Sequence, residues 1–332
     1  MTAIIDIYTH IIPAAYLDAL STGGPALGDL NKRLRSIRSM LDLEARFREM
    51  DGLGDYRQVI SLPNPPIEEI AAGKTAAQLA RIANEAMAEL CARHPDRFAG
   101  FVAAVSLDDM DQALGEIDRA IDQLGAKGVL IYSNVAGHPL DEARFESLFA
   151  AMARLDAPIW LHPARSATMP DYASEPKSRF EMWWCFGWPY ETSVAMARLV
   201  FCGVFDRYPG LKVITHHLGG MVPYFEGRVG SGLEVLGRRT PDEDYSTVLT
   251  SLKRPHLDYF REFFADTALF GARSGLRTGI DFFSPERVVF ASDSPLSSIP
   301  AAIAALGEIG LSQGETEMIM SGNARRLLKL AA

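Results

Sequence analysis

The run Ile4–His10 (IIDIYTH) is the first apolar stretch of the chain, and it ends in polar side chains. We interpret Ile4–Tyr8 as a buried β-strand, because short runs rich in Ile are typical of parallel sheets that are covered on both faces. Tyr8 and His10 are two positions apart, so both side chains can face the same side of one strand. The run therefore predicts a first strand that presents two functional groups near its carboxyl end.

Seven further short runs rich in Val and Ile follow, and segments with helical periodicity separate them, for example Ala72–Ala92 and Met110–Leu124. Eight strands that each lead into a helix predict an α/β fold of the (β/α)8 type, a TIM barrel. No GxGxxG or GxxxxGK(S/T) motif follows the first strand, which argues against a dinucleotide site or a P-loop. The seven further strands are expected at Gln58–Leu62, Phe98–Val105, Gly128–Tyr132, Pro158–His162, Lys212–His216, Phe263–Asp266 and Arg287–Ala291.

No repeat, low-complexity tract or linker divides the 332 residues, so we predict a single domain over residues 1–332. Two irregular segments are predicted as insertions into the barrel. Ser21–Ser39 follows the first strand, carries four basic residues and is a candidate lid. Pro163–Pro189 follows the fifth strand and is rich in Trp and Phe.

The composition limits the classes of partner. A net charge of −9 and a pI near 5.3 make nucleic acid and anionic membranes poor partners. An anionic small molecule stays compatible with this charge, because a local arginine or a metal ion can outweigh it. Three cysteines are too few for a disulfide framework, and neither a secretion signal nor an apolar run of membrane-spanning length is visible. We therefore expect a cytoplasmic protein.

Polar side chains mark the carboxyl ends of the predicted strands, which is where barrels of this type carry their active sites. Imidazole and carboxylate groups are the ligands that Zn2+ and similar divalent ions prefer. If the sixth strand continues through two adjacent histidines, their side chains face opposite sides and only one can enter the site. The strand-end residues are Tyr8, His10, His162, His216, His217 and Asp293.

Four stretches around these residues resemble the strand motifs of the amidohydrolase superfamily: Asp6–Pro13 (DIYTHIIP), Trp160–Pro163 (WLHP), Thr215–Pro223 (THHLGGMVP) and Phe290–Pro295 (FASDSP). Their order and separation fit the superfamily from residue 3 to about residue 328. The resemblance is strongest to the branch of aminocarboxymuconate-semialdehyde decarboxylase. It implies one divalent metal ion, with Zn2+ favoured and Mn2+ as the second choice, and no organic cofactor.

The resemblance also implies roles for single residues. His10, His162 and Asp293 match the metal ligands, with Asp293 also in the catalytic set. His217, directly before Leu-Gly-Gly, matches the catalytic base, which leaves His216 as a packed or supporting residue. Asp293 could instead only cap the helix expected near Pro295, and the two ligand histidines could be hydrogen-bonded core residues.

Two arginines match substrate-anion ligands of the decarboxylase branch. Arg46 lies in Glu44–Asp51 (EARFREMD), and Arg228 lies in Pro223–Arg228 (PYFEGR), a stretch whose arginine reaches the pocket of a neighbouring subunit. By this resemblance we expect a carboxylate substrate, held by guanidinium groups, and a homodimer. The alternative for each arginine is a solvated surface charge.

Tyr8 departs from the family, which usually has His, or in some decarboxylases Glu or Ala, at this position. A phenol has an unperturbed pKa of ~10 and must lose its proton to be a good ligand. Tyr8 is therefore a phenolate ligand, or a hydrogen-bond donor to a water or substrate oxygen, or it marks a site that binds metal weakly or not at all. We favour the hydrogen-bond role, in which Tyr8 is catalytic and the metal keeps three protein ligands.

The cluster of Trp183, Trp184, Phe186 and Trp188 is expected either to pack inside its insertion or to line the site. In the second case Trp183 and Trp188 would form an apolar wall for an aromatic or conjugated substrate.

These observations predict a metal-dependent decarboxylase of an aromatic or unsaturated carboxylate. His217, or a water that it activates, would handle the proton that replaces CO2. Two alternatives stay open. One is a hydrolase or hydratase with the same ligands and base, and the other is a non-catalytic barrel that has lost its metal.

Overall fold

The computed structural model describes residues 3–21, 31–241 and 243–330. Two parallel sheets form the centre of an α/β fold, one with strand order β1-β2-β3 and one with order β11-β10-β9-β8-β5-β4. A short antiparallel pair, β6 and β7, lies outside them. The strands are β1 (Ile4–His10), β2 (Tyr56–Ser61), β3 (Phe98–Phe101), β4 (Ala103–Ala104), β5 (Val129–Tyr132), β6 (Asn134–Val135), β7 (His138–Pro139), β8 (Ile159–His162), β9 (Val213–Thr215), β10 (Phe264–Asp266) and β11 (Val288–Val289).

Each of the eight expected strands is present with shifted ends. β1 runs two residues further than expected, so His10 is part of the strand, and all seven of its residues are buried. The expected strand Phe98–Val105 is interrupted at Val102 and is described as β3 and β4. β9 ends at Thr215, one residue earlier than expected, which changes the direction of the two histidines that follow.

Backbone hydrogen bonds connect the two sheets at both of their edges. At one edge, Val102 donates to the carbonyl of Ile60 over 2.9 Å, and Lys127, just before β5, donates to the carbonyl of Phe101 in β3 over 2.8 Å. At the other edge, β1 lies beside residues 290–294: Ile7 donates to Phe290 over 3.0 Å, and Thr9 forms a parallel bridge with Ser294. The first strand and the segment after the last strand are therefore neighbours.

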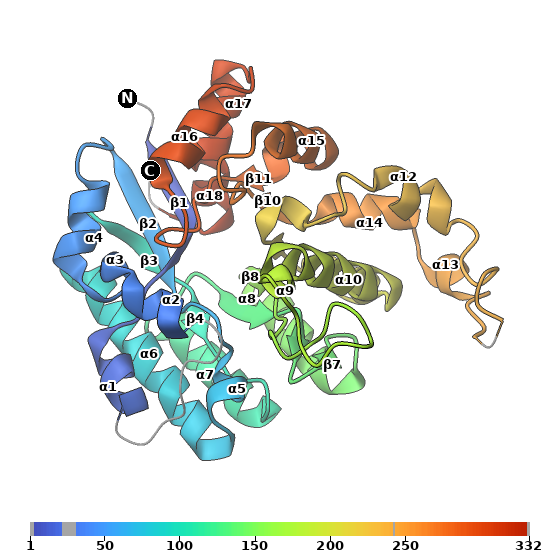
Figure 1. Ribbon diagram of the computed structural model, residues 1–332, viewed down its shortest axis with the longest axis horizontal. Helices are drawn as coiled ribbons and strands as arrows, with labels where there is room; N and C mark the ends of the chain where they lie inside the picture. Colours follow the sequence, from blue (N-terminus) through green and yellow to red (C-terminus); the bar gives the residue numbers. More distant parts are fainter. Residues whose placement is uncertain (1–2, 22–30, 242, 331–332) are drawn as a thin grey trace.

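Helices surround the strands, as Figure 1 shows, and the segment from α12 to α14 projects away from them. The predicted helices Ala72–Ala92 and Met110–Leu124 correspond to α6 and α7. The helices are α1 (Ala14–Ser21), α2 (Asn31–Ser36), α3 (Arg38–Leu41), α4 (Leu43–Met50), α5 (Ile67–Ile70), α6 (Gly73–Arg93), α7 (Met110–Asp122), α8 (Glu146–Leu155), α9 (Met182–Cys185), α10 (Gly187–Phe201), α11 (Val204–Arg207), α12 (Glu226–Val229), α13 (Val248–Ser251), α14 (His256–Glu262), α15 (Arg273–Phe283), α16 (Ile299–Gly307), α17 (Gln313–Glu317) and α18 (Asn323–Leu327), with a π-helical turn at Met318–Gly322.

Two apolar clusters stabilise this arrangement. The larger joins the helices to the strands, and the smaller is made mainly of strand residues, with the C-terminal helix α18 packed against them. Trp160 belongs to the smaller cluster and donates its indole N–H to the carbonyl of Ile7 over 3.0 Å. The smaller cluster consists of Ile5, Ile7, Tyr8, Val59, Val102, Leu130, Tyr132, Trp160, Ala164, Ile214, Ala268, Val289, Ala291, Ala324, Leu327 and Leu328.

Of the expected insertion Ser21–Ser39, residues 22–30 lie outside the described part of the chain, and the rest includes α2. The segment Pro163–Pro189 includes α9 and the start of α10. Among the described residues, no helix combines the length and apolar character that crossing a membrane requires.

Candidate metal centre and active site

Five histidine and aspartate side chains from four parts of the chain converge at the carboxyl ends of the parallel strands. The ligand atoms of His10, His162 and His216 all lie within 4.8 Å of one another, and the same holds for His216, His217 and Asp293. All five side chains are buried. His10 ends β1, His162 ends β8, His216 and His217 follow β9, and Asp293 follows β11.

The protonation of two imidazoles follows from their hydrogen bonds. Nδ1 of His10 lies 3.1 Å from the carbonyl oxygen of Leu62, and Nδ1 of His162 lies 2.7 Å from that of Pro163. A carbonyl oxygen only accepts, so each Nδ1 carries the hydrogen and each Nε2 presents a lone pair. An outer hydrogen bond of this kind also orients histidines that bind metals.

Asp293 meets His10 without a hydrogen bond. Its Oδ1 lies 3.2 Å from Nε2 of His10, yet both atoms are buried and neither has a hydrogen-bond partner in the part of the chain described. Burial opposes ionisation of Asp293, but interactions with His10 and His216 hold the pKa of its carboxyl well below the usual range. A carboxylate oxygen and a ring lone pair that face each other require a cation between them, so these residues fit a divalent metal.

Asp293 is not a helix cap, so that alternative is wrong. Helix α16 begins at Ile299, and the side chain of Ser298 caps it by accepting from Ala301. Asp293 itself has a positive φ of 63°, and its backbone N–H donates to the carbonyl of Tyr8 over 3.2 Å. The turn therefore directs the carboxylate toward β1.

His216 and His217 both enter the cluster, which corrects the expectation that only one of them can. The strand stops at Thr215, and His217 has a positive φ of 52°, so the alternation of a strand does not apply to the pair. Their ring centroids are 3.7 Å apart. His217 Nδ1 has no hydrogen-bond partner among the residues described.

Asp266, the last residue of β10, holds both histidines. Its Oδ2 lies 2.5 Å from Nδ1 of His216, and its Oδ1 accepts the backbone N–H of His217 over 3.1 Å. Sequence reasoning did not select Asp266 as a site residue, although it ends the seventh expected strand. The rule that identified the other strand-end residues would have found it.

Burial and neighbouring charges separate the pKa values of the two adjacent imidazoles. Burial, together with the nearby His216, lowers the pKa of His217 to about 3. Burial also acts against a charge on His216, but Asp266 outweighs it and raises the pKa of His216 to about 9. His217 is thus neutral near pH 7 and can accept a proton, a property that a general base requires.

Tyr8 packs directly on His216. The two rings are stacked, with centroids 3.9 Å apart and planes 13° from parallel, and the Tyr8 hydroxyl has no hydrogen-bond partner among the described residues. Burial raises the pKa of this phenol well above its ordinary value. A phenol that keeps its proton favours hydrogen-bond donation over metal ligation.

A cavity of about 490 Å³ is lined in part by Asp293. Trp183 and Trp188 both line it, and Trp188 also contacts His162, with ring centroids 5.4 Å apart. The cavity has cationic residues on its wall that sequence reasoning noted as basic but did not assign to the site. The full lining is Lys32, Arg33, Ser36, Glu181, Trp183, Trp184, Trp188, Phe270, Asp293 and Leu296.

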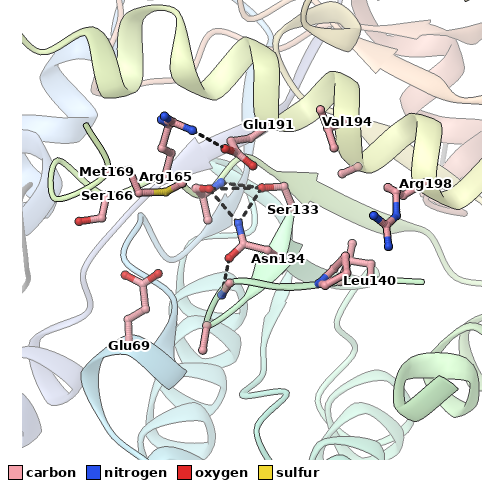
Figure 2. A pocket seen from close by; sticks show the side chains of 15 residues that line it. Glu69, Ser133, Asn134, Leu140, Arg165, Ser166, Met169, Glu191, Val194 and Arg198 are labelled. Carbon is pink, nitrogen blue, oxygen red and sulfur yellow. Dashed lines mark hydrogen bonds and ion pairs between the residues drawn. The ribbon is translucent and has the colours of Figure 1, made fainter. Parts of the chain in front are cut away.

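A polar network fixes the chain directly after His162, and Figure 2 shows it beside a second cavity of about 400 Å³. Ala164 donates to the hydroxyl of Ser133 and accepts from the amide of Asn134, each over 2.9 Å. Arg165 forms an ion pair with Glu191 of α10 over 2.9 Å. These contacts position the segment that carries the tryptophans relative to His162.

Arg46 is 1% exposed, so the alternative of a solvated charge is wrong for this residue. Its Nη1 donates to the backbone carbonyl of His10 and its Nε to the side chain of Gln58, each over 2.7 Å. Nη2 has no hydrogen-bond partner within the described ranges. Arg228, in contrast, is exposed on α12, with its guanidinium over the ring of Phe225.

A family model described as amidohydrolase matches residues 5–330. The chain belongs to the amidohydrolase family. This amidohydrolase is 32% identical to gamma-resorcylate decarboxylase of Rhizobium radiobacter over 321 residues, which cover 91% of each chain. It is 27% identical to 2-amino-3-carboxymuconate-6-semialdehyde decarboxylase of Dictyostelium discoideum, over 98% of this chain and 91% of that one. The resemblance to this decarboxylase branch is thereby confirmed.

The similarity to this decarboxylase branch also holds for the three-dimensional structure. The dihydroxybenzoic acid decarboxylase of Polaromonas sp. JS666, with bound manganese and the inhibitor 2-nitroresorcinol, superimposes on this amidohydrolase with a TM-score of 0.81. The two are 28% identical, and the match covers 99% of this chain and 97% of the other. The two proteins therefore share the same fold over nearly their whole lengths.

Proposed function

We propose that this protein is a metal-dependent decarboxylase of an aromatic or unsaturated carboxylic acid. The observation that carries the proposal is the buried, unpartnered pair of His10 Nε2 and Asp293 Oδ1, in which Asp293 also lines a cavity walled by tryptophans. Decarboxylation takes precedence over other metal-assisted reactions because the relatives compared above are decarboxylases.

His10, His162 and Asp293 would hold one divalent ion. The donor set of two imidazoles and a carboxylate suits Zn2+ or Mn2+. The manganese in the Polaromonas enzyme supports Mn2+ at least as well as the Zn2+ favoured from the sequence. When bound, the ion would supply Lewis-acid stabilisation of the negative charge that develops on the substrate.

The other side chains would bind the substrate and move one proton. Trp183 and Trp188 offer flat apolar surfaces for a conjugated ring. Loss of CO2 leaves an electron pair on the substrate carbon, and a proton must replace the carboxyl group there. His217, which is neutral, would take up a proton from a water or from an acidic group of the substrate and pass it to this carbon, or a water that it activates would supply it. The Tyr8 hydroxyl would donate a hydrogen bond to a substrate oxygen.

Arg46 and Arg228 are proposed to bind substrate anions. For Arg46 the support is the unpartnered Nη2, and the guanidinium otherwise holds the backbone of His10. Arg228 is exposed on α12 beside Tyr224 and Phe225, which are 79% and 38% exposed. Exposed aromatic side chains next to an arginine suit an interface, so we propose a homodimer in which Arg228 completes the partner's site.

We also propose that the strands close into a (β/α)8 barrel that forms one domain, with insertions at Ser21–Ser39 and Pro163–Pro189. The backbone hydrogen bonds at both sheet edges support closure. Lys32 and Arg33 from the first segment and Trp183 from the second border the same cavity, which supports their assignment as active-site insertions. A cytoplasmic location stays a prediction from the sequence.

The test is turnover of acids labelled with 13C at the carboxyl group, with hydroxybenzoates, muconate-like acids and aryl β-keto acids as the panel. Release of labelled CO2 by the metal-loaded protein is expected. Label that stays in an organic acid product would instead support the hydrolase, for which the unpartnered Tyr8 hydroxyl is the favourable observation, since it could donate to a developing oxyanion. Failure to bind any divalent metal would favour the non-catalytic barrel.

A further inference from the structure

His216 presents a buried ring nitrogen to the centre of the cluster. Its side chain is fully buried, and Nε2 has no hydrogen-bond partner in the described part of the molecule. The nearby carboxylate oxygen, Oδ1 of Asp293, is 3.8 Å away, which is too far for a hydrogen bond. A ring nitrogen of His216 nevertheless lies within 4.8 Å of ring nitrogens of His10 and His162.

Asp266 fixes which nitrogen of His216 is available. Nδ1 lies 2.5 Å from Oδ2 of Asp266, and a carboxylate accepts the ring hydrogen at this position. With Nδ1 held by Asp266, Nε2 is the nitrogen that faces the cluster, and a metal ion would take the place of any proton there. A carboxylate behind a ring in this way is the arrangement that sets the tautomer of metal-binding histidines and raises their basicity.

Tyr8 fixes the plane of the same ring. It stacks on His216 at 3.9 Å and meets His10 edge-on with centroids 5.4 Å apart. A side chain held by a carboxylate at one nitrogen and by an aromatic ring on its face has little freedom to turn away. His216 is thus aimed at the point where the unpartnered atoms of His10 and Asp293 also meet.

We propose that His216 Nε2 is a further ligand of the metal ion, with Asp266 as its positioning residue and with Tyr8 packed against it as a non-ligand. This inference rests on the proposed function for the presence of the ion. It changes the ligand set from two imidazoles and a carboxylate to three imidazoles and a carboxylate. His217 then remains as the unligated imidazole of the cluster.

The experiment counts imidazole ligands directly. Metal-free protein is loaded with Mn2+, and pulsed electron paramagnetic resonance measures how many ring nitrogens couple to the ion. We expect three in the unsubstituted protein, two in His216→Asn, and three in both His217→Asn and Tyr8→Phe. Affinity for Mn2+, measured on the same samples, should fall ~10–100-fold in Asp266→Asn, because loss of such an outer hydrogen bond weakens metal binding by that factor.

Two coupled nitrogens in the unsubstituted protein, or three in His216→Asn, would overturn the assignment of His216. An unchanged affinity in Asp266→Asn would remove Asp266 from its positioning role. The count on the unsubstituted protein and on His217→Asn decides the question even if His216→Asn does not fold. A protein that binds Mn2+ through three imidazoles but decarboxylates no acid would refute the proposed function alone, and one that binds no divalent metal would refute both.

Discussion

Nε2 of His10 and Oδ1 of Asp293 lie 3.2 Å apart, and neither has a hydrogen-bond partner in the described ranges. The hydrogen of the His10 ring is engaged at Nδ1, toward the carbonyl of Leu62. Buried polar atoms in native proteins almost always have partners, so a pair of unpartnered acceptors calls for an explanation. A cation shared by the two atoms provides it.

Removal of the Asp293 carboxylate should therefore remove the metal. We expect Asp293→Ala to lose both metal content and CO2 release, measured by elemental analysis and by the labelled-carboxyl assay. Asp281→Ala is the control, because Asp281 is an exposed carboxylate on α15 and its loss should leave both readouts intact. Full metal content in Asp293→Ala would exclude this carboxylate as a ligand.

His217→Asn should separate proton transfer from metal binding. Loss of a general acid or base typically costs at least ~100-fold in rate, so turnover should fall by that factor. Metal content should stay unchanged because His217 is not in the proposed ligand set. Substitution of the exposed His138 by Asn serves as the control. Normal turnover in His217→Asn would eliminate this residue from the mechanism.

Tyr8→Phe removes the hydroxyl and keeps the ring that stacks on His216. We expect retained metal and a reduced rate, because the hydroxyl has no structural hydrogen bond in the described part of the chain to lose. Elemental analysis and steady-state kinetics measure the two effects. Metal loss in this variant would show instead that the phenol oxygen is a ligand.

Arg46→Met tests how much the buried guanidinium contributes to stability. It would leave the carbonyl of His10 and the side chain of Gln58 without their donor. Each buried acceptor left unpaired costs roughly 1–3 kcal/mol, so the free energy of unfolding should fall by at least about 2 kcal/mol in urea titrations. Arg48→Ala, at an exposed position on the same helix, should change the free energy of unfolding by less than about 0.5 kcal/mol. A role in substrate binding would appear separately, as a raised KM in Arg46→Lys.

The raised pKa of Asp6 predicts that the stability of the fold depends on pH. Burial raises its pKa from 3.8 to about 6, although hydrogen bonds from Ser292 and Tyr56 act in the opposite direction. The folded protein therefore keeps a proton that the unfolded chain loses. The resulting stabilisation is complete below about pH 4 and disappears as the pH rises through 6, a loss of about 3 kcal/mol at 1.36 kcal/mol per pKa unit.

Asp6→Asn should remove this part of the pH dependence. The amide oxygen can still accept the two backbone N–H groups of Tyr8 and Ser292. Between pH 4 and pH 7 the free energy of unfolding of the unsubstituted protein should therefore fall relative to that of Asp6→Asn. A difference that is constant over this range would show that Asp6 has an ordinary pKa in the folded state.

The sequence was sufficient to locate the strands and most of the cluster, because parallel strands are continuous apolar runs and their carboxyl ends meet on one side. The sequence was insufficient where the position of a side chain depended on an unusual backbone φ or on a contact with a distant part of the chain. The positive φ of His217, which brings His216 and His217 together, has no sequence signal in a non-glycine residue. The buried guanidinium of Arg46 is held by Gln58 of strand β2, so the helical pattern around Arg46 could not reveal its burial.

The contact between β1 and residues 290–294 has a consequence for biosynthesis. His10 leaves the ribosome before its counterpart Asp293, which lies far along the chain. A nascent polypeptide thus lacks one side of the proposed centre until Asp293 has emerged. Once in place, the ion would connect β1 to the segment after β11 and would oppose detachment of β1.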